Sequence, residues 1–133
     1  MQRPMQSTLA ASVLLMLAAA PLAAEALVTP AETRGTWAHE AAACGNPSSD
    51  GRIAIREAEI EFFGSLCRIV RVQAHSASAW AGHFRCEESG EFEEADIELE
   101  IPGASADRNR LRLRIDRGEW RPLVRCPRDV PVR

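Results

Sequence analysis

The stretch that decides the fold is residues 96–115, DIELEIPGASADRNRLRLRI. Apolar and charged residues alternate on both sides of a polar loop, and this period of two indicates half-buried β-strands. Antiparallel pairing of Leu99 with Leu113 joins the two apolar faces. The same register sets Glu98 opposite Arg114, where opposite charges stabilise the pair. A slip by one residue would turn both apolar faces to water, so the register is well specified.

Further short segments of strand character follow one another after residue 26, separated by turn residues. With the two above they make about eight: 34–37, 52–56, 59–63, 66–74, 79–86, 92–101, 110–116 and 120–125. Because the links between them are mostly of hairpin length, we predict an all-β domain, a small antiparallel meander barrel. The alternative is an open sheet with a short helix across one end. The Ala-rich stretch 38–43 is the candidate for that helix.

The N-terminus has the features of an export signal. A single basic residue, Arg3, precedes the uncharged run from Leu9 to Ala24, and the small-residue pattern Ala24-Glu25-Ala26 follows. This order is typical of a secretory signal peptide. The run has 16 residues, whereas a membrane-spanning helix needs about 20. We therefore predict a cleaved signal over 1–26 and a single soluble domain over 27–133, periplasmic or secreted, with no membrane span.

Four cysteines lie in the predicted domain: Cys44, Cys67, Cys86 and Cys126. An exported chain meets an oxidising compartment, so an even number of cysteines predicts two disulfides. Each would stabilise the fold by roughly 2–4 kcal/mol. A metal site is disfavoured because no C-x-x-C pair occurs. Three connectivities are compatible with four cysteines, and we favour Cys44–Cys67 with Cys86–Cys126.

An acidic run is the most unusual feature of the chain. Its surplus carboxylates gather in or near one turn: Glu87, Glu88, Glu91, Glu93 and Glu94. One interpretation is a solvated strand face that pairs with the arginines downstream. The other is a surface that steers a basic protein partner. The net charge of −3, together with the absence of a basic stripe, argues against nucleic acid.

The sequence carries no pattern of catalytic or metal-binding residues. It lacks G-x-S-x-G and any phosphate-binding glycine loop, and His39, His75 and His83 show no ligand spacing. We therefore expect no enzyme activity, no metal and no cofactor. The larger apolar residues are assigned to the core or, alternatively, to a pocket for a small apolar ligand: Trp37, Trp80, Phe84 and Leu113.

The first predicted strand contains Gly35-x-Trp37, which resembles the G-x-W motif of lipocalin-like (calycin) barrels. The resemblance implies that the tryptophan closes one end of the barrel and that an arginine on the last strand packs over it. Arg121 and Arg125 are the candidates for that arginine. The chain is more similar to the smaller exported barrels of bacteria, a group that includes lysozyme and protease inhibitors and members with no known role.

These observations together predict an exported, non-catalytic binding module, either protein-binding or inhibitory. The alternative is a small apolar-ligand carrier whose barrel interior is lined by Trp80, Phe84 and Leu113. Neither the partner nor the oligomeric state follows from the sequence.

Overall fold

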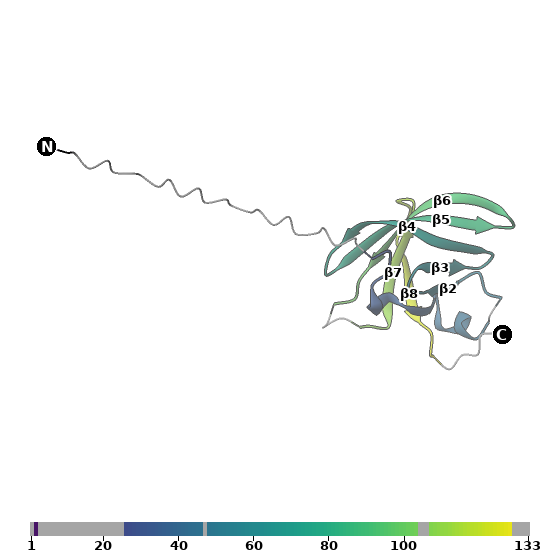
Figure 1. The fold of residues 1–133 in the computed structure, drawn as a ribbon. Coiled ribbons are helices and arrows are strands. Elements are labelled where there is room, and N and C mark those ends of the chain that lie inside the picture. Colours follow the sequence, from purple (N-terminus) through teal and green to yellow (C-terminus); the bar gives the residue numbers. More distant parts are fainter. Residues whose placement is uncertain (1, 3–25, 47, 104–106, 129–133) are drawn as a thin grey trace.

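The computed structural model describes residues 2, 26–46, 48–103 and 107–128. The predicted signal peptide, residues 1–26, lies outside this part except for Gln2 and Ala26. The described part contains two short 3₁₀ helices and eight strands (Figure 1). Their bounds are η1 Ala31–Thr33, β1 Gly35–Ala38, η2 Ala41–Gly45, β2 Arg52–Ile55, β3 Glu59–Phe62, β4 Ser65–His75, β5 Ala79–Glu88, β6 Glu91–Glu100, β7 Arg110–Ile115 and β8 Arg121–Arg125.

The eight strands close into an antiparallel meander barrel, which confirms the predicted fold class. Each strand pairs with the next one along the chain, and β1 pairs with β8 through Trp37 opposite Arg125. Most of the links are short enough to force neighbouring strands to pair, so the order in space follows the order in sequence. The alternative of an open sheet with a short helix across one end is wrong, because the barrel is closed. Of the Ala-rich stretch 38–43, Ala38 belongs to β1, and residues 41–43 begin the 3₁₀ helix η2.

The pairing of β6 with β7 has the predicted register. Leu99 lies opposite Leu113, and both side chains are fully buried. Glu98 lies opposite Arg114 and accepts two hydrogen bonds from its guanidinium, the one from Nη2 to Oε1 measuring 2.9 Å. The alternation of apolar and charged residues therefore defined both the strands and their alignment, as a period of two requires.

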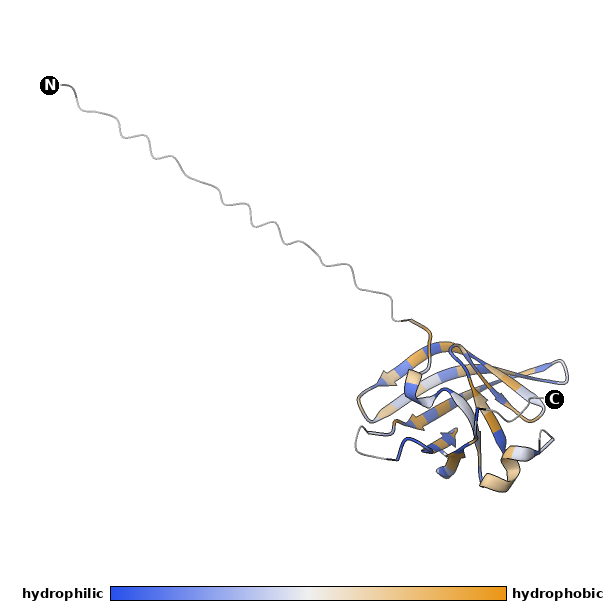
Figure 2. Ribbon diagram, turned by 90° about the horizontal axis from the view of Figure 1, so that it is seen from below, coloured by the Kyte–Doolittle hydropathy of each residue, from blue (hydrophilic) through white to orange (hydrophobic). Residues whose placement is uncertain are grey.

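The barrel interior holds the main core. Apolar and charged residues alternate along several strands, as the hydropathy colouring shows (Figure 2). The buried apolar members of these strands form the main core. Gly82 on β5 makes room for the largest of these side chains. A Cβ atom at that position would lie 2.4 Å from the ring of Trp80 and 2.9 Å from the ring of Phe84. The two rings fold over the glycine and meet edge to face, with centroids 5.8 Å apart.

The two disulfides are present, but the pairing that we favoured is wrong. The bonds join Cys67 to Cys86 and Cys44 to Cys126. Cys67 on β4 lies directly opposite Cys86 on β5, with their Cα atoms 3.9 Å apart. Cys44 belongs to η2, which packs against the outer face of the barrel beside the residue that follows β8. The register of β4 and β5 sets the first bond, and the docking of η2 beside the end of β8 sets the second.

Because consecutive strands are antiparallel, successive connections lie at opposite ends of the barrel, and the two ends differ. One end, which we call the tryptophan end, is covered by η1, where Trp37 Nε1 donates a hydrogen bond to the Thr33 carbonyl at 2.8 Å. The other end, which we call the acidic end, collects the connections 39–51, 63–64, 89–90 and 116–120. The acidic residues singled out from the sequence lie at and below this second end.

Candidate functional site

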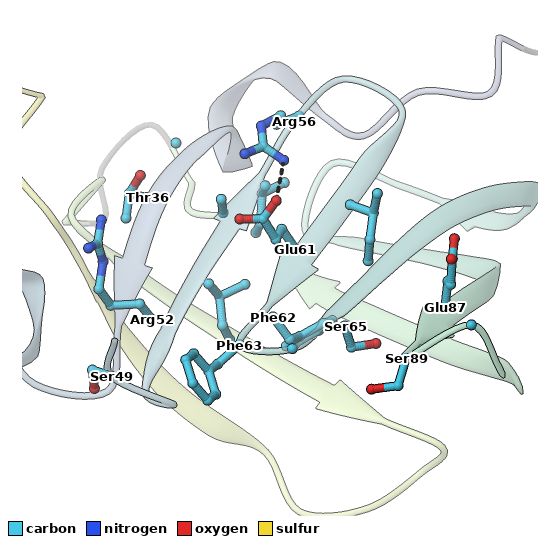
Figure 3. Close-up of a pocket in the computed structure, with 17 residues that line it drawn as sticks. Thr36, Ser49, Arg52, Arg56, Glu61, Phe62, Phe63, Ser65, Glu87 and Ser89 are labelled. Atoms are coloured by element: carbon cyan, nitrogen blue, oxygen red, sulfur yellow. Dashed lines mark hydrogen bonds and ion pairs between the residues drawn. The ribbon is translucent and has the colours of Figure 1, made fainter. Parts of the chain in front are cut away.

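A groove of about 820 Å³ runs along the wall formed by β1 to β4 and reaches the acidic end (Figure 3). At that end its lining includes the β3–β4 turn, Phe63-Gly64, and the β5–β6 turn, Ser89-Gly90. β4, which follows the first turn, and β5, which precedes the second, are joined by the Cys67–Cys86 disulfide. The groove therefore connects the side of the barrel with the acidic end.

Strand register decides which side chains form the floor of the groove. Trp37 and Ile53 are paired and buried, so the residues next to them in the sequence face outward. The outward row lines the groove: Thr36, Ala54, Glu61, Leu66 and Glu87. Because the first two members are small, the floor is hollow above β1 and β2.

Charged and aromatic side chains border this floor. Arg56 Nη1 lies 3.3 Å from a carboxylate oxygen of Glu61 and 3.3 Å from one of Glu59, and Figure 3 marks the pair with Glu61. Arg52 lines the groove on the β2 side. Phe63, in the turn at the acidic end, is 61% exposed. The groove thus combines a floor of small, apolar and acidic side chains, arginines at its border and an aromatic residue open to solvent.

The acidic hairpin β5–β6 turns through Ser89 and Gly90, both at positive φ (51° and 81°), as a tight two-residue hairpin turn requires. This turn sets Glu88 directly opposite Glu91, and Glu93 follows on the same face opposite Cys86. The three carboxylates line a second, smaller pocket of about 190 Å³. Like charges directly opposite each other destabilise a sheet, so this arrangement costs folding free energy.

The five predicted acidic residues are divided among three places. Glu88, Glu91 and Glu93 meet at the small pocket. Glu87 lines the large groove from the outer face of the hairpin. Glu94 lies lower on the outer face, where its Oε2 is 3.4 Å from Nε2 of His83.

His83 lies between two carboxylates, which sequence reasoning did not find. Its Nδ1 is 2.7 Å from a carboxylate oxygen of Asp96, which lies directly opposite in the register of β5 and β6. The hydrogen bond to Asp96 raises the pKa of His83, and the hydrogen bond from His83 lowers the pKa of Asp96. The alignment of β5 with β6 contained the signal, because that register alone places the two residues together.

Exposed apolar residues accompany the acidic hairpin. Phe92 lies opposite Glu87 on the outer face and is 54% exposed. The guanidinium of Arg85 stacks on its ring at 4.2 Å from the centroid. Sequence reasoning missed Phe92 and Phe63 as surface residues, although an aromatic residue within a run of glutamates is itself a signal of exposure.

The four residues assigned to core or pocket all lie in the main core: Trp37, Trp80, Phe84 and Leu113. Each is at most 1% exposed. Neither the groove nor the small pocket takes any lining from them. Among the described residues, Trp80 Nε1 has no hydrogen-bond partner, so this polar atom inside the barrel is unsatisfied there.

The described residues contain no group of three or more His, Cys, Asp or Glu side chains placed to hold a metal ion. Nor does any helix in that part of the chain have the length and apolar character needed to span a membrane. The fold and the site define a closed eight-stranded antiparallel barrel with two disulfides and an acidic, partly apolar rim. No protein-family model, curated protein or solved structure matches the chain.

Proposed function

We propose that this protein is an exported, non-catalytic binding module, a small lipocalin-like barrel that captures a basic protein at its acidic end. The observation that carries the proposal is that three carboxylates, which make no ion pair among the described residues, lie at the same end of the barrel as two exposed aromatic rings. Glu88, Glu91 and Glu93 supply the charge, and Phe63 and Phe92 supply apolar surface.

The energetics of the hairpin support a role in binding. Opposing Glu88 and Glu91 across the strands costs stability in the free protein. A cationic side chain from a partner would relieve that repulsion, so the removal of this unfavourable energy would contribute to the free energy of binding. Charge of one sign at a rim also accelerates encounter with an oppositely charged protein. Aromatic residues at the same place match the composition of protein interfaces.

Export is supported by the two disulfides, which persist in an oxidising compartment. The lipocalin-like relationship is supported by the strand count and by Arg125, whose guanidinium lies over the Trp37 ring. The alternative, a small apolar-ligand carrier, receives no support from the two pockets, because the residues assigned to that cavity are packed in the core.

The experiment measures binding of lysozyme, used as a basic protein probe, at about 10 mM salt, where charges act over about 30 Å. The test variant carries Glu88→Arg and Glu91→Arg. The control carries Glu32→Arg and Glu57→Arg, which change the net charge equally and lie outside the acidic end. We expect the test variant to lose at least tenfold in affinity and the control to lose much less. Equal losses in both variants, or no binding by the unmodified protein, would contradict the proposal.

A further inference from the structure

The barrel leaves two stretches of strand edge without a neighbouring strand. β4 pairs with β3 only through Ser65–Arg68, although β4 continues to His75. Its edge over residues 70–75 is therefore free within the described part of the chain. β6 pairs with β7 only from Ile97 onward, so its edge over residues 91–95 is free in the same sense. Such edges present backbone donors and acceptors to another strand.

Both free edges carry an exposed apolar side chain. Among the described residues, four large apolar side chains are exposed, and two of them are Val70 and Phe92. Val70 is 45% exposed and lies in the free stretch of β4, where the strand has a register shift between Ile69 and Arg71. Phe92 is 54% exposed and lies in the free stretch of β6.

The two edges have opposite charge. The free stretch of β4 contains Arg71, which makes no ion pair within the described residues. Arg68 lies two residues before the stretch and is paired with Glu59. The free stretch of β6 contains Glu91, Glu93 and Glu94. Each stretch has five or six residues, about 17–20 Å of strand. The edges therefore match in length, in charge and in exposed apolar surface.

We propose that the free edge of β6 in one molecule pairs with the free edge of β4 in a second copy of this chain. The contact extends the sheet β4–β5–β6 of one molecule into that of the next. The contact is heterologous, so a pair of molecules keeps one free basic edge and one free acidic edge for further copies, and repeated contacts build rings or chains. The inference goes beyond the proposed function, since it concerns self-association and uses the free stretch of β4, residues 70–75, which lies outside the acidic end. The other stretch, on β6, contains Glu91, Glu93 and Phe92 of the proposed binding surface.

Register shifts and charges make this pairing selective. β4 is irregular between Ile69 and Arg71 and again between Val72 and Ala74, and such irregularities discourage indiscriminate pairing at an edge. The glutamates of β6 repel a second β6 edge, as Arg71 repels a second β4 edge. Only the β4–β6 combination brings opposite charges together.

The test uses two variants of the protein purified after export. The β4-edge variant carries Val70→Glu and Arg71→Glu, and the β6-edge variant carries Glu91→Arg and Phe92→Arg. Both pairs of substitutions are compatible with the fold, because each introduced charge lies opposite a neutral or oppositely charged side chain, or beside one that is. Arg71 lies opposite His83 on β5, and the new arginines of β6 lie opposite Glu88 and Glu87.

Sedimentation velocity is measured over a wide concentration range at low salt. We expect the unmodified protein to self-associate, each variant alone to remain monomeric, and the mixture of the two variants to associate, because acidic and basic edges meet again. A monomeric unmodified protein, a self-associating β4-edge variant or a mixture of monomers would each overturn the inference. The β4-edge variant retains the acidic hairpin, so its lysozyme binding reports on the proposed function separately.

Discussion

The guanidinium of Arg125 lies 4.2 Å from the centre of the Trp37 ring, so the last strand covers the largest side chain of the first. Its Nη1 donates a hydrogen bond to the Arg34 carbonyl and its Nη2 to the Glu32 carbonyl, both at 2.8 Å. Burial lowers the pKa of Arg125, but a guanidinium remains protonated in proteins. One side chain thus ties the N-terminal segment, β1 and β8 together at the tryptophan end.

The substitution Arg125→Lys tests whether these contacts of Arg125 stabilise the barrel. Lysine keeps the charge but lacks the planar fork that reaches two carbonyls and stacks on an aromatic ring. We expect a loss of about 1–3 kcal/mol in the free energy of unfolding, the usual cost of unpaired buried polar groups. Urea denaturation measures it. Arg121→Lys is the matched control, because Arg121 is exposed on the same strand. Equal stability of the two variants would show that the fork is unimportant.

Gly35 is required by the same contact. Its φ of 138° is unfavourable for residues with a side chain, and an added Cβ would lie 2.8 Å from Nη1 of Arg125. We expect Gly35→Ala to destabilise the protein by about 1–3 kcal/mol, the usual cost of backbone strain. Gly45→Ala is the control, since nothing lies within 4 Å of a Cβ there. Thermal unfolding that ranks Gly45→Ala as the more harmful change would refute this explanation.

The sequence predicted those features that depend on local alternation. The register of Leu99 with Leu113 followed from a period of two. The arginine over Trp37 did not follow from alternation; the resemblance of Gly35-x-Trp37 to the motif of lipocalin-like barrels implied it. Features set by the closed barrel were beyond reach. The Cys44–Cys126 bond depends on where η2 docks on the outer face. The groove and the two free strand edges depend on how far each strand pairing extends, and no local pattern encodes where a pairing stops.

Trp80 and Trp37 offer a matched comparison inside the core. Trp37 Nε1 donates to the Thr33 carbonyl, whereas Trp80 Nε1 finds no partner in the part of the chain that the structure describes. Substitution by Phe leaves a similar gap at both sites but removes a satisfied donor at one and an unsatisfied donor at the other. An unpaired buried polar group costs about 1–3 kcal/mol. We therefore expect Trp80→Phe to be less destabilising than Trp37→Phe by at least about 1 kcal/mol in urea unfolding. The opposite order would indicate that Trp80 Nε1 binds a buried water or ligand.

We expect the two disulfides to contribute differently to the free energy of unfolding. The bond between Cys44 and Cys126 spans 82 residues, and the bond between Cys67 and Cys86 spans 19. The longer loop restricts the unfolded chain more, by about 1 kcal/mol in the chain-entropy account. Replacing both cysteines of the longer loop by serine should therefore lower stability more than the same change in the shorter loop. Non-reducing peptide mapping checks the pairing, and a Cys44–Cys67 peptide would contradict it.

His83 should make stability depend on pH. Its pKa is raised above 6.5, first by the hydrogen bond to Asp96, with Glu94 adding to the effect and Arg71 opposing it. The imidazolium is thus favoured in the folded state. Its contribution is complete below the unfolded pKa of 6.5 and is lost as pH rises through the folded value. The pKa of Asp96 is lowered, so this carboxylate remains ionised across that range.

We accordingly expect the melting temperature of the unmodified protein to exceed that of His83→Gln most at about pH 5.5, where both carboxylates face a charged ring. The difference should shrink steadily towards pH 9, because a neutral imidazole binds the two carboxylates more weakly. His75→Gln is the control, since His75 is exposed and makes no ion pair among the described residues. A difference for His83→Gln that is constant with pH would mean that the ring acts by packing alone. A difference that grows with pH would mean that folding favours the neutral ring.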